Sequence, residues 1–190
     1  PYAIDWINVP AGSYSLTAVA TDDAGGSTTS SPVAISVQAA GSGSVQMQEG
    51  SNGYAGTRDT YLVKSAPTGN FGKAVTLNTT TATDNAALVR FAIFQSEGGP
   101  VPNGATITAA TLSLYKYTTY DYVYRVHRIL VAWDETQATW NNRMTGIPWS
   151  AAGCSGSDTD YLATADDQRA VTWDPQWIDF DVTAGVQIAF

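Results

Sequence analysis

Short runs of alternating apolar and polar residues recur along most of this chain, and turn-forming residues separate them. The clearest runs are residues 60–63, 74–78, 87–94, 106–117, 122–132 and 177–182. Clusters of glycine, proline and asparagine fall between them, as in residues 67–72 and 98–104. Many short strands without a helical period predict an all-β protein, a sandwich or a barrel. Only residues 163–171 indicate a turn or two of helix.

The alternation also predicts which side chains enter the core, because successive side chains of a strand point to opposite faces. Leu112 and Leu114 share one face of their run, whereas Tyr115 and Tyr117 share the other. In residues 177–182 apolar positions alternate with aspartates, and we expect the apolar set to be buried.

Residues 87–94 are a special case because both faces of this run carry apolar side chains. One face holds Leu88 and Arg90, and the other holds Val89, Phe91 and Ile93. We expect the second set to point into the core.

The pattern divides the chain into two parts. Residues 1–38 contain two alternating strands around a turn, and they resemble the C-terminal strands of a bacterial immunoglobulin-like domain. Two strands cannot bury a core alone, so we expect the earlier strands of that domain to lie upstream. Residues 39–44 are Ala, Gly and Ser and are typical of a flexible linker. Residues 45–190 form the second domain.

The composition favours an extracellular β-sandwich over a cytosolic enzyme. The 190 residues carry a formal net charge of -8, with only 14% charged residues and 44% apolar residues. Nucleic-acid binding needs clustered Lys and Arg and is therefore disfavoured. No apolar run reaches the 18 residues that a membrane-spanning helix requires. The lone Cys154 cannot form an internal disulfide, and we interpret it as a packing or loop residue.

Several motifs resemble one known family. They are Gln-Glu-Gly-Ser-Asn-Gly-Tyr-Ala-Gly-Thr-Arg-Asp-Thr at 48–60, Pro-Thr-Gly-Asn-Phe-Gly at 67–72, Leu-Val-Arg-Phe at 88–91 and Trp-Asp-Glu-Thr-Gln-Ala-Thr-Trp-Asn-Asn at 133–142. In this order they are similar to the DNRLRE (disaggregatase-related) domain, over residues 45–190. The resemblance implies an antiparallel jelly-roll β-sandwich attached to polysaccharide-active enzymes or surface proteins, and some relatives bind acidic polysaccharides such as alginate. The family's closing strand is expected beyond Phe190.

The segment at 133–142 allows two interpretations. Trp133 and Trp140 would stack on a sugar ring while Glu135 and Asn141 bind hydroxyls. Alternatively, the tryptophans pack the core and the polar residues satisfy backbone groups of a corner. We include Trp140 among the candidate carbohydrate-binding residues.

A tyrosine-rich hairpin is the other candidate surface. Aromatic rings beside cations would stack on an acidic sugar and pair with its carboxylate. Cross-strand aromatic packing, or contact with a neighbouring domain of the same chain, is the alternative. The candidates are Tyr115, Lys116, Tyr117, Tyr122, Tyr124 and Arg125, with Arg58 and Lys64 extending the cationic patch.

Glu49, Asp59 and Asp181 come from the first and last strands of the expected jelly roll. Carboxylates that meet there would suit a structural calcium ion, which prefers several oxygen ligands. No catalytic motif is present, and adjacent carboxylates such as Asp134 and Glu135 do not provide the facing pair of a glycosidase.

The sequence therefore predicts a non-catalytic carbohydrate-binding module from a larger secreted bacterial protein. The first alternative is a structural or adhesive stalk module without a sugar site. The second is a non-catalytic fragment of a polysaccharide lyase or hydrolase.

Overall fold

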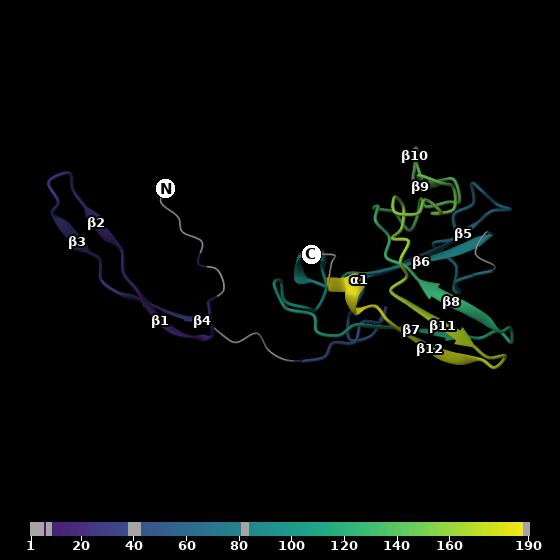
Figure 1. The fold of residues 1–190 in the computed structure, drawn as a ribbon, viewed down its shortest axis with the longest axis horizontal. Helices are drawn as coiled ribbons and strands as arrows, with labels where there is room; N and C mark the ends of the chain where they lie inside the picture. The colour runs from purple at the N-terminus through teal and green to yellow at the C-terminus, as the bar shows by residue number, and fades with distance from the viewer. Residues whose placement is uncertain (1–5, 7–8, 38–42, 81–83, 188–190) are drawn as a thin grey trace. The chain divides into compact units, whose positions relative to one another are not determined.

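The computed structural model describes residues 6, 9–37, 43–80 and 84–187. The chain forms two compact units, Pro1–Val45 and Gln46–Phe190 (Figure 1). Most of the predicted linker, residues 39–42, lies outside the described residues. No helix among the described residues is long and apolar enough to cross a membrane.

In the first unit, the residues that the structure describes form two antiparallel strand pairs. Strand β1 (Gly12–Leu16) pairs with β4 (Val33–Val37), and β2 (Val19–Thr21) pairs with β3 (Ser27–Thr29). None of its described residues is buried, as expected for two ribbons without a second layer. Its relationship to an immunoglobulin-like domain stays a prediction.

The described residues of the second unit form eight strands, a 3₁₀ turn and one short helix. They are β5 (Thr57–Val63), β6 (Asn85–Phe91), η1 (Gln95–Glu97), β7 (Thr111–Lys116), β8 (Tyr122–Val126), β9 (Asn142–Met144), β10 (Ile147–Pro148), β11 (Asp167–Val171), β12 (Gln176–Asp181) and α1 (Thr183–Gln187). The pairs β5–β6, β7–β12, β8–β11 and β9–β10 are all antiparallel. The predicted all-β class is confirmed, and the arrangement is consistent with a β-sandwich.

Two expected elements differ from the structure. Residues 163–171 form no helix, because residues 167–171 are strand β11, paired with β8 along its whole length. Residues 74–78 form no strand. Val75 is almost fully exposed, so its side chain packs against no sheet.

One core lies among the strands of the β7–β12 and β8–β11 ribbons. Phe180 and Ile178 are buried and lie directly opposite Leu112 and Leu114. Val171 of β11 is buried in the same cluster. The predicted inward positions of β7 and β12 are confirmed, and their other faces are left toward solvent.

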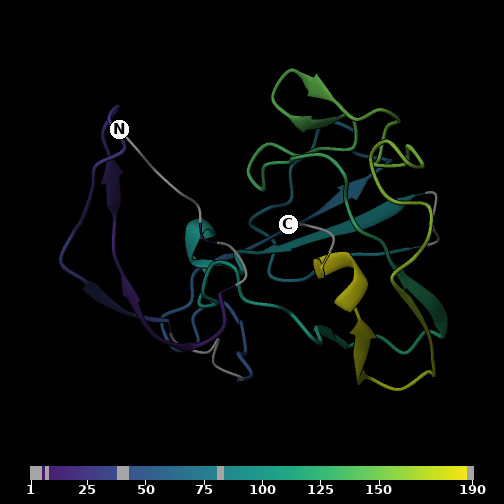
Figure 2. The same ribbon diagram turned by 60° about the vertical axis from the view of Figure 1, so that its left-hand side comes forward.

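A second core lies on one face of the β5–β6 ribbon. Leu62 and Leu88 pack there with Ala138, Trp149 and Cys154 from the long segment between β8 and β11. Figure 1 and Figure 2 both show this green segment lying against the blue-green ribbon.

This packing corrects the expected orientation of β6. Leu88 is buried, whereas Val89 is only partly so. Apolar residues occupy both faces of β6, so the pairing with β5 determines which face is buried. In that pairing Leu88 lies opposite the buried Thr60. Arg90 therefore shares the core-facing side and lies where that side opens to solvent.

Candidate functional site

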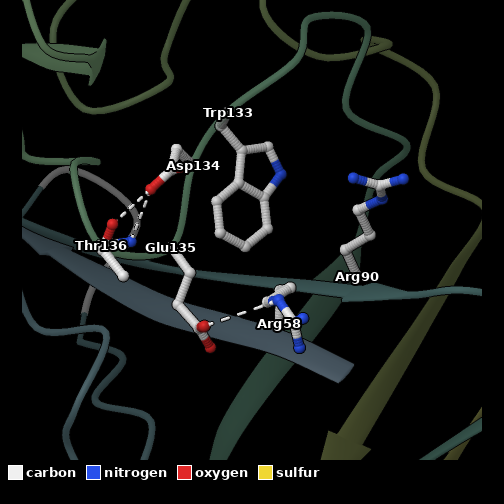
Figure 3. A pocket seen from close by; sticks show the side chains of 6 residues that line it. All are labelled: Arg58, Arg90, Trp133, Asp134, Glu135 and Thr136. Carbon is white, nitrogen blue, oxygen red and sulfur yellow. Dashed lines mark hydrogen bonds and ion pairs between the residues drawn. The ribbon is translucent and has the colours of Figure 1, made fainter. Parts of the chain in front are cut away.

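A small cleft lies at the solvent-open end of the β5–β6 ribbon. The antiparallel register places Arg58 directly opposite Arg90, and the indole of Trp133 lies beside them (Figure 3). The cavity has a volume of about 150 Å³. Its lining residues are Arg58, Arg90, Trp133, Asp134, Glu135 and Thr136.

Each arginine of the cleft faces one carboxylate. Arg58 Nε lies 3.8 Å from Glu135 Oε2, and Arg90 Nη2 lies 3.3 Å from Glu97 Oε1. Both guanidinium side chains are more than half exposed. Exposed ion pairs of this kind contribute about 0–1 kcal/mol. Arg58 Nη1 also donates to the carbonyls of Ala55 and Thr57, at 3.3 and 2.6 Å.

The loop that carries Trp133 is held by its own hydrogen bonds. Asp134 Oδ1 accepts bonds from the backbone N–H and the hydroxyl of Thr136, at 2.9 and 2.7 Å. The hydroxyl bond is the main cause that lowers the pKa of the Asp134 carboxyl. Glu135 Oε1 accepts a bond from the backbone N–H of Asp59 at 2.9 Å, which joins the loop to β5.

A second motif supports this loop from outside the cleft. Asn70 Nδ2 donates to the carbonyls of Glu135 and Ala138, both at 2.8 Å. A Cβ at Gly72 would collide with the carbonyl of Glu135. The Pro-Thr-Gly-Asn-Phe-Gly and Trp-Asp-Glu motifs are therefore parts of one structural contact, which fixes the position of Glu135.

Trp140 lies away from the cleft. It packs against the core of the β5–β6 face, and its ring covers Gly153, where a Cβ would meet the indole. The neighbouring Trp149 is buried and donates from Nε1 to the Thr139 carbonyl at 2.8 Å. Both tryptophans of the 133–142 segment pack against this core, but only Trp133 also lines the cleft.

The predicted tyrosines do not form a single patch. Tyr115 faces outward from β7, and Tyr117 just beyond the strand is also exposed. Tyr122 and Tyr124 belong to β8 and contact each other edge to face. Tyr124 packs against the core, and burial raises the pKa of its hydroxyl.

Lys116 is a correction to the predicted cationic surface. Its side chain is only 6% exposed, and Nζ donates to the carbonyls of Thr172 and Asp174, at 2.6 and 3.3 Å. Alternation alone places this residue on the face of Leu112 and Leu114. The amine therefore holds the β11–β12 loop and is not available to a ligand.

The remaining predicted cations lie on the surface outside the cleft. Arg125 Nε donates to Gln168 Oε1 at 3.2 Å, and Lys64 pairs with Asp84 at 3.6 Å. Neither lines the cleft with Arg58. Of the predicted cations, only Arg58 lines the cleft with the half-buried Trp133.

The three predicted calcium ligands are not all brought together: Glu49 lies near enough to Asp59 for its charge to raise the pKa of Asp59, but Asp181 lies on another ribbon. Asp59 lies on β5, which pairs with β6, whereas Asp181 ends β12, which pairs with β7. Asp181 Oδ1 accepts the N–H of Thr183, and Glu49 Oε2 accepts that of Thr57. In the part of the chain that the structure describes, no group of three or more His, Cys, Asp or Glu residues could hold a metal ion. A bound calcium ion stays a prediction.

Sequence reasoning missed three residues of these surfaces. Arg90 was assigned to the solvent face because its neighbours Val89 and Phe91 were expected inside. Trp177 occupies an outward position of β12, which alternation with Ile178 already indicates. Trp173 lies in the β11–β12 loop, where no periodicity applies.

The comparisons agree with a sugar-binding surface. The family model of carbohydrate-binding module family 96 matches residues 51–190, and the chain therefore belongs to carbohydrate-binding module family 96. Searches of curated proteins and of solved structures found no match. Membership in this family points to a non-catalytic domain that binds carbohydrate. The DNRLRE resemblance stays a prediction.

Proposed function

We propose that this protein is a non-catalytic polysaccharide-binding module of a larger secreted bacterial protein, and that it binds an acidic sugar residue in the cleft beside Trp133. The observation that supports this proposal best is the pair of guanidinium groups, Arg58 and Arg90, on directly opposed strand positions next to an indole. Family membership supplies the class of ligand.

The cleft offers the groups that a sugar requires. The half-buried indole of Trp133 presents an apolar face to the C–H side of a pyranose, while the carboxylates of Asp134 and Glu135 accept bonds from hydroxyls. Pockets for drug-sized ligands measure about 300–1,000 Å³. The cavity of about 150 Å³ is smaller than these, so the proposal places a single sugar unit in it, within a chain that continues over the surface.

The two arginines favour a sugar that carries a carboxylate. A planar guanidinium can hold a carboxylate through two parallel hydrogen bonds. The ligand must compete with Glu135 and Glu97, but their ion pairs are exposed and weak. Because the whole chain is acidic, long-range attraction does not help, and the preference comes from contacts within the cleft. A uronate polymer such as alginate is the proposed ligand class.

The biological effect would be tethering outside the cell. A module that holds its parent protein on a polysaccharide raises the effective concentration of that protein at its target. The module itself needs no catalytic group for this role.

Native affinity electrophoresis of the full chain tests the proposal. Gels contain alginate, pectin, xylan or cellulose, and the variants are Arg58→Gln with Arg90→Gln, and as a matched control Lys64→Gln with Arg125→Gln. Both pairs remove the same charge, but only the first pair lines the cleft.

The proposal predicts that an acidic polymer retards the wild type and the control variant but not the Arg58/Arg90 variant. Loss of retardation in the control variant alone would move the site to another cationic surface. A cooperatively folded wild type that no polymer retards would favour the structural stalk module.

A further inference from the structure

The outer face of the β7–β12 ribbon carries a strip of exposed side chains. Because Leu112, Leu114, Ile178 and Phe180 fill the inner face, the alternate residues must point outward. These outward residues form three directly opposed pairs, Thr111 with Asp181, Ser113 with Asp179, and Tyr115 with Trp177.

Two large aromatic rings lie side by side on this strip. Tyr115 is 53% exposed and Trp177 is 65% exposed. Their ring centroids are 5.4 Å apart, and the ring planes meet at 60°. A folded protein gains nothing from leaving so much aromatic surface in water, so such a pair indicates a binding surface.

Hydrogen-bonding groups continue the strip along the strands. Ser113 Oγ donates to Asp179 Oδ1 at 2.6 Å, one outward position from the aromatic pair. Two residues along a strand span about 7 Å. Carboxylate and hydroxyl oxygens bind sugar hydroxyls, whereas Asp179 and Asp181 would repel a sugar carboxylate. The six outward residues include no cation. Arg169 of β11 lies beside Asp179 and Asp181, but its guanidinium pairs with Asp167 at 2.7 Å and donates to the Asp179 carbonyl at 2.9 Å.

At one end of the strip, the buried Lys116 joins the end of β7 to the β11–β12 loop. Its amine binds the carbonyls on either side of Trp173, and it lies next to Tyr117 in the chain. Trp173 is 62% exposed and Tyr117 is 56% exposed. The β11–β12 loop and the end of β7, each carrying an exposed ring, are thereby held together.

We propose that the outer face of β7 and β12 is a second glycan-binding surface, which stacks an uncharged polysaccharide chain on Trp177 and Tyr115. The proposal uses the carbohydrate-binding family but does not depend on the arginine cleft. The acidic residues beside the rings set its ligand apart from the acidic sugar proposed there.

The dimensions of the strip favour a glycan over a protein partner. Even with Tyr117 and Trp173 added to Tyr115 and Trp177, the exposed parts of the aromatic side chains amount to roughly 500 Å² when each carries about 150–250 Å². A stable protein interface needs about 800 Å² from each partner. A strip two strands wide fits one extended chain better than a second protein surface.

Affinity electrophoresis and pull-down with neutral polymers test this proposal on the full chain. The polymers are hydroxyethylcellulose, glucomannan and regenerated cellulose, with alginate for comparison. The test variant is Tyr115→Ala with Trp177→Ala. The matched control is Tyr120→Ala with Tyr122→Ala, which removes two exposed aromatic rings from the loop before β8 and its first residue.

The proposal predicts that at least one neutral polymer binds the wild type, the Tyr120/Tyr122 variant and the Arg58/Arg90 variant. The Tyr115/Trp177 variant should bind at least about tenfold more weakly. If that variant fails to fold, the single exposed substitution Trp177→Gln provides the same comparison.

Two results would overturn the inference. One is a wild type that binds no neutral polymer, and the other is unchanged binding by a folded Tyr115/Trp177 variant. Sedimentation velocity adds a check, because a dimer lost in that variant would assign the face to a second copy of the chain. Failure here with intact alginate binding would leave the cleft proposal standing, and the reverse result would leave this one standing.

Discussion

Arg58 lies directly opposite Arg90 in the antiparallel register of β5 and β6. Like charges at directly opposed sheet positions destabilise the pair by up to about 1 kcal/mol. Glu135 and Glu97 offset this repulsion only through exposed contacts. Two like charges held on opposed strand positions beside a half-buried indole are better explained by a ligand than by folding.

Replacing one of these arginines should therefore separate stability from binding. Arg58→Gln removes the repulsion with Arg90 and also the exposed hydrogen bonds to Ala55 and Thr57, so we expect the free energy of unfolding to change by less than about 1 kcal/mol, while retardation by acidic polysaccharide falls. Urea unfolding and affinity electrophoresis of the same samples measure the two effects. A stability loss above about 1 kcal/mol would instead assign the guanidinium to the fold.

Lys116 should combine a structural role with a binding role. Lys116→Met removes the donor to the Thr172 and Asp174 carbonyls, and we expect about 2 kcal/mol of destabilisation. Neutral-polymer binding should weaken as well, because the loop with Trp173 loses its attachment. The exposed Lys73→Met is the control and should change neither urea unfolding nor retardation. Wild-type stability in Lys116→Met would show that the amine is not essential to the loop.

Asp160 is the most deeply buried carboxylate of the described residues, with 1% exposure. It accepts the backbone N–H groups of Ser150, Ala151 and Gly156 at 2.7–3.0 Å. Asp160→Asn places an amide donor against these donors, and we expect a loss of about 3 kcal/mol in the free energy of unfolding. Chemical denaturation of this variant measures the loss, and the exposed Asp174→Asn serves as the control. Equal stability of both variants would contradict this assignment.

The Asp59 carboxyl should make stability depend on pH. Burial, followed by the charges of Glu135 and Glu49, raises its pKa above the ordinary value of 3.8. The native state then holds this proton to higher pH than the unfolded chain. Its contribution to stability therefore falls as pH rises from the unfolded pKa through the folded pKa.

Asp59→Asn removes that loss, so its melting temperature should exceed the wild-type value at pH 7. The gain should disappear below pH 3.8, where the carboxyl is protonated in both states. Calorimetry at pH 7 and pH 3 measures both, with the exposed Asp121→Asn as control. A variant less stable than the wild type at pH 7 would indicate a bound cation, as the calcium prediction requires.

The sequence predicts the fold best where one strand face is clearly apolar. Leu112 and Ile178 sit inside as expected, because their strands alternate with polar residues. The predicted orientation of β6 was wrong because Leu88 and Val89 are both apolar. Only the pairing with β5 shows which of the two faces is buried. Strand register of this kind depends on the geometry of the intervening loop and is not visible in a local pattern.

The same limit applies to the candidate sites. Arg58 could be selected as a cation, but its neighbour Arg90 could be found only once the register was known. Lys116 shows the opposite error. It was predicted to be exposed because it is charged, although it lies two positions from Leu114 and therefore on the buried face of the strand. Trp177 was accessible to the alternation argument, since it lies on the face opposite Ile178.

The most direct test of the central claim uses the indole N–H signals of the six tryptophans in a two-dimensional NMR spectrum. The signals are assigned by single substitutions, and the full chain is titrated with a uronate oligosaccharide. The account predicts a saturable shift of the Trp133 signal, together with the side-chain Nε–H signals of Arg58 and Arg90. A titration that leaves Trp133 unmoved, or that moves only Trp177, would contradict an acidic-sugar site in the arginine cleft.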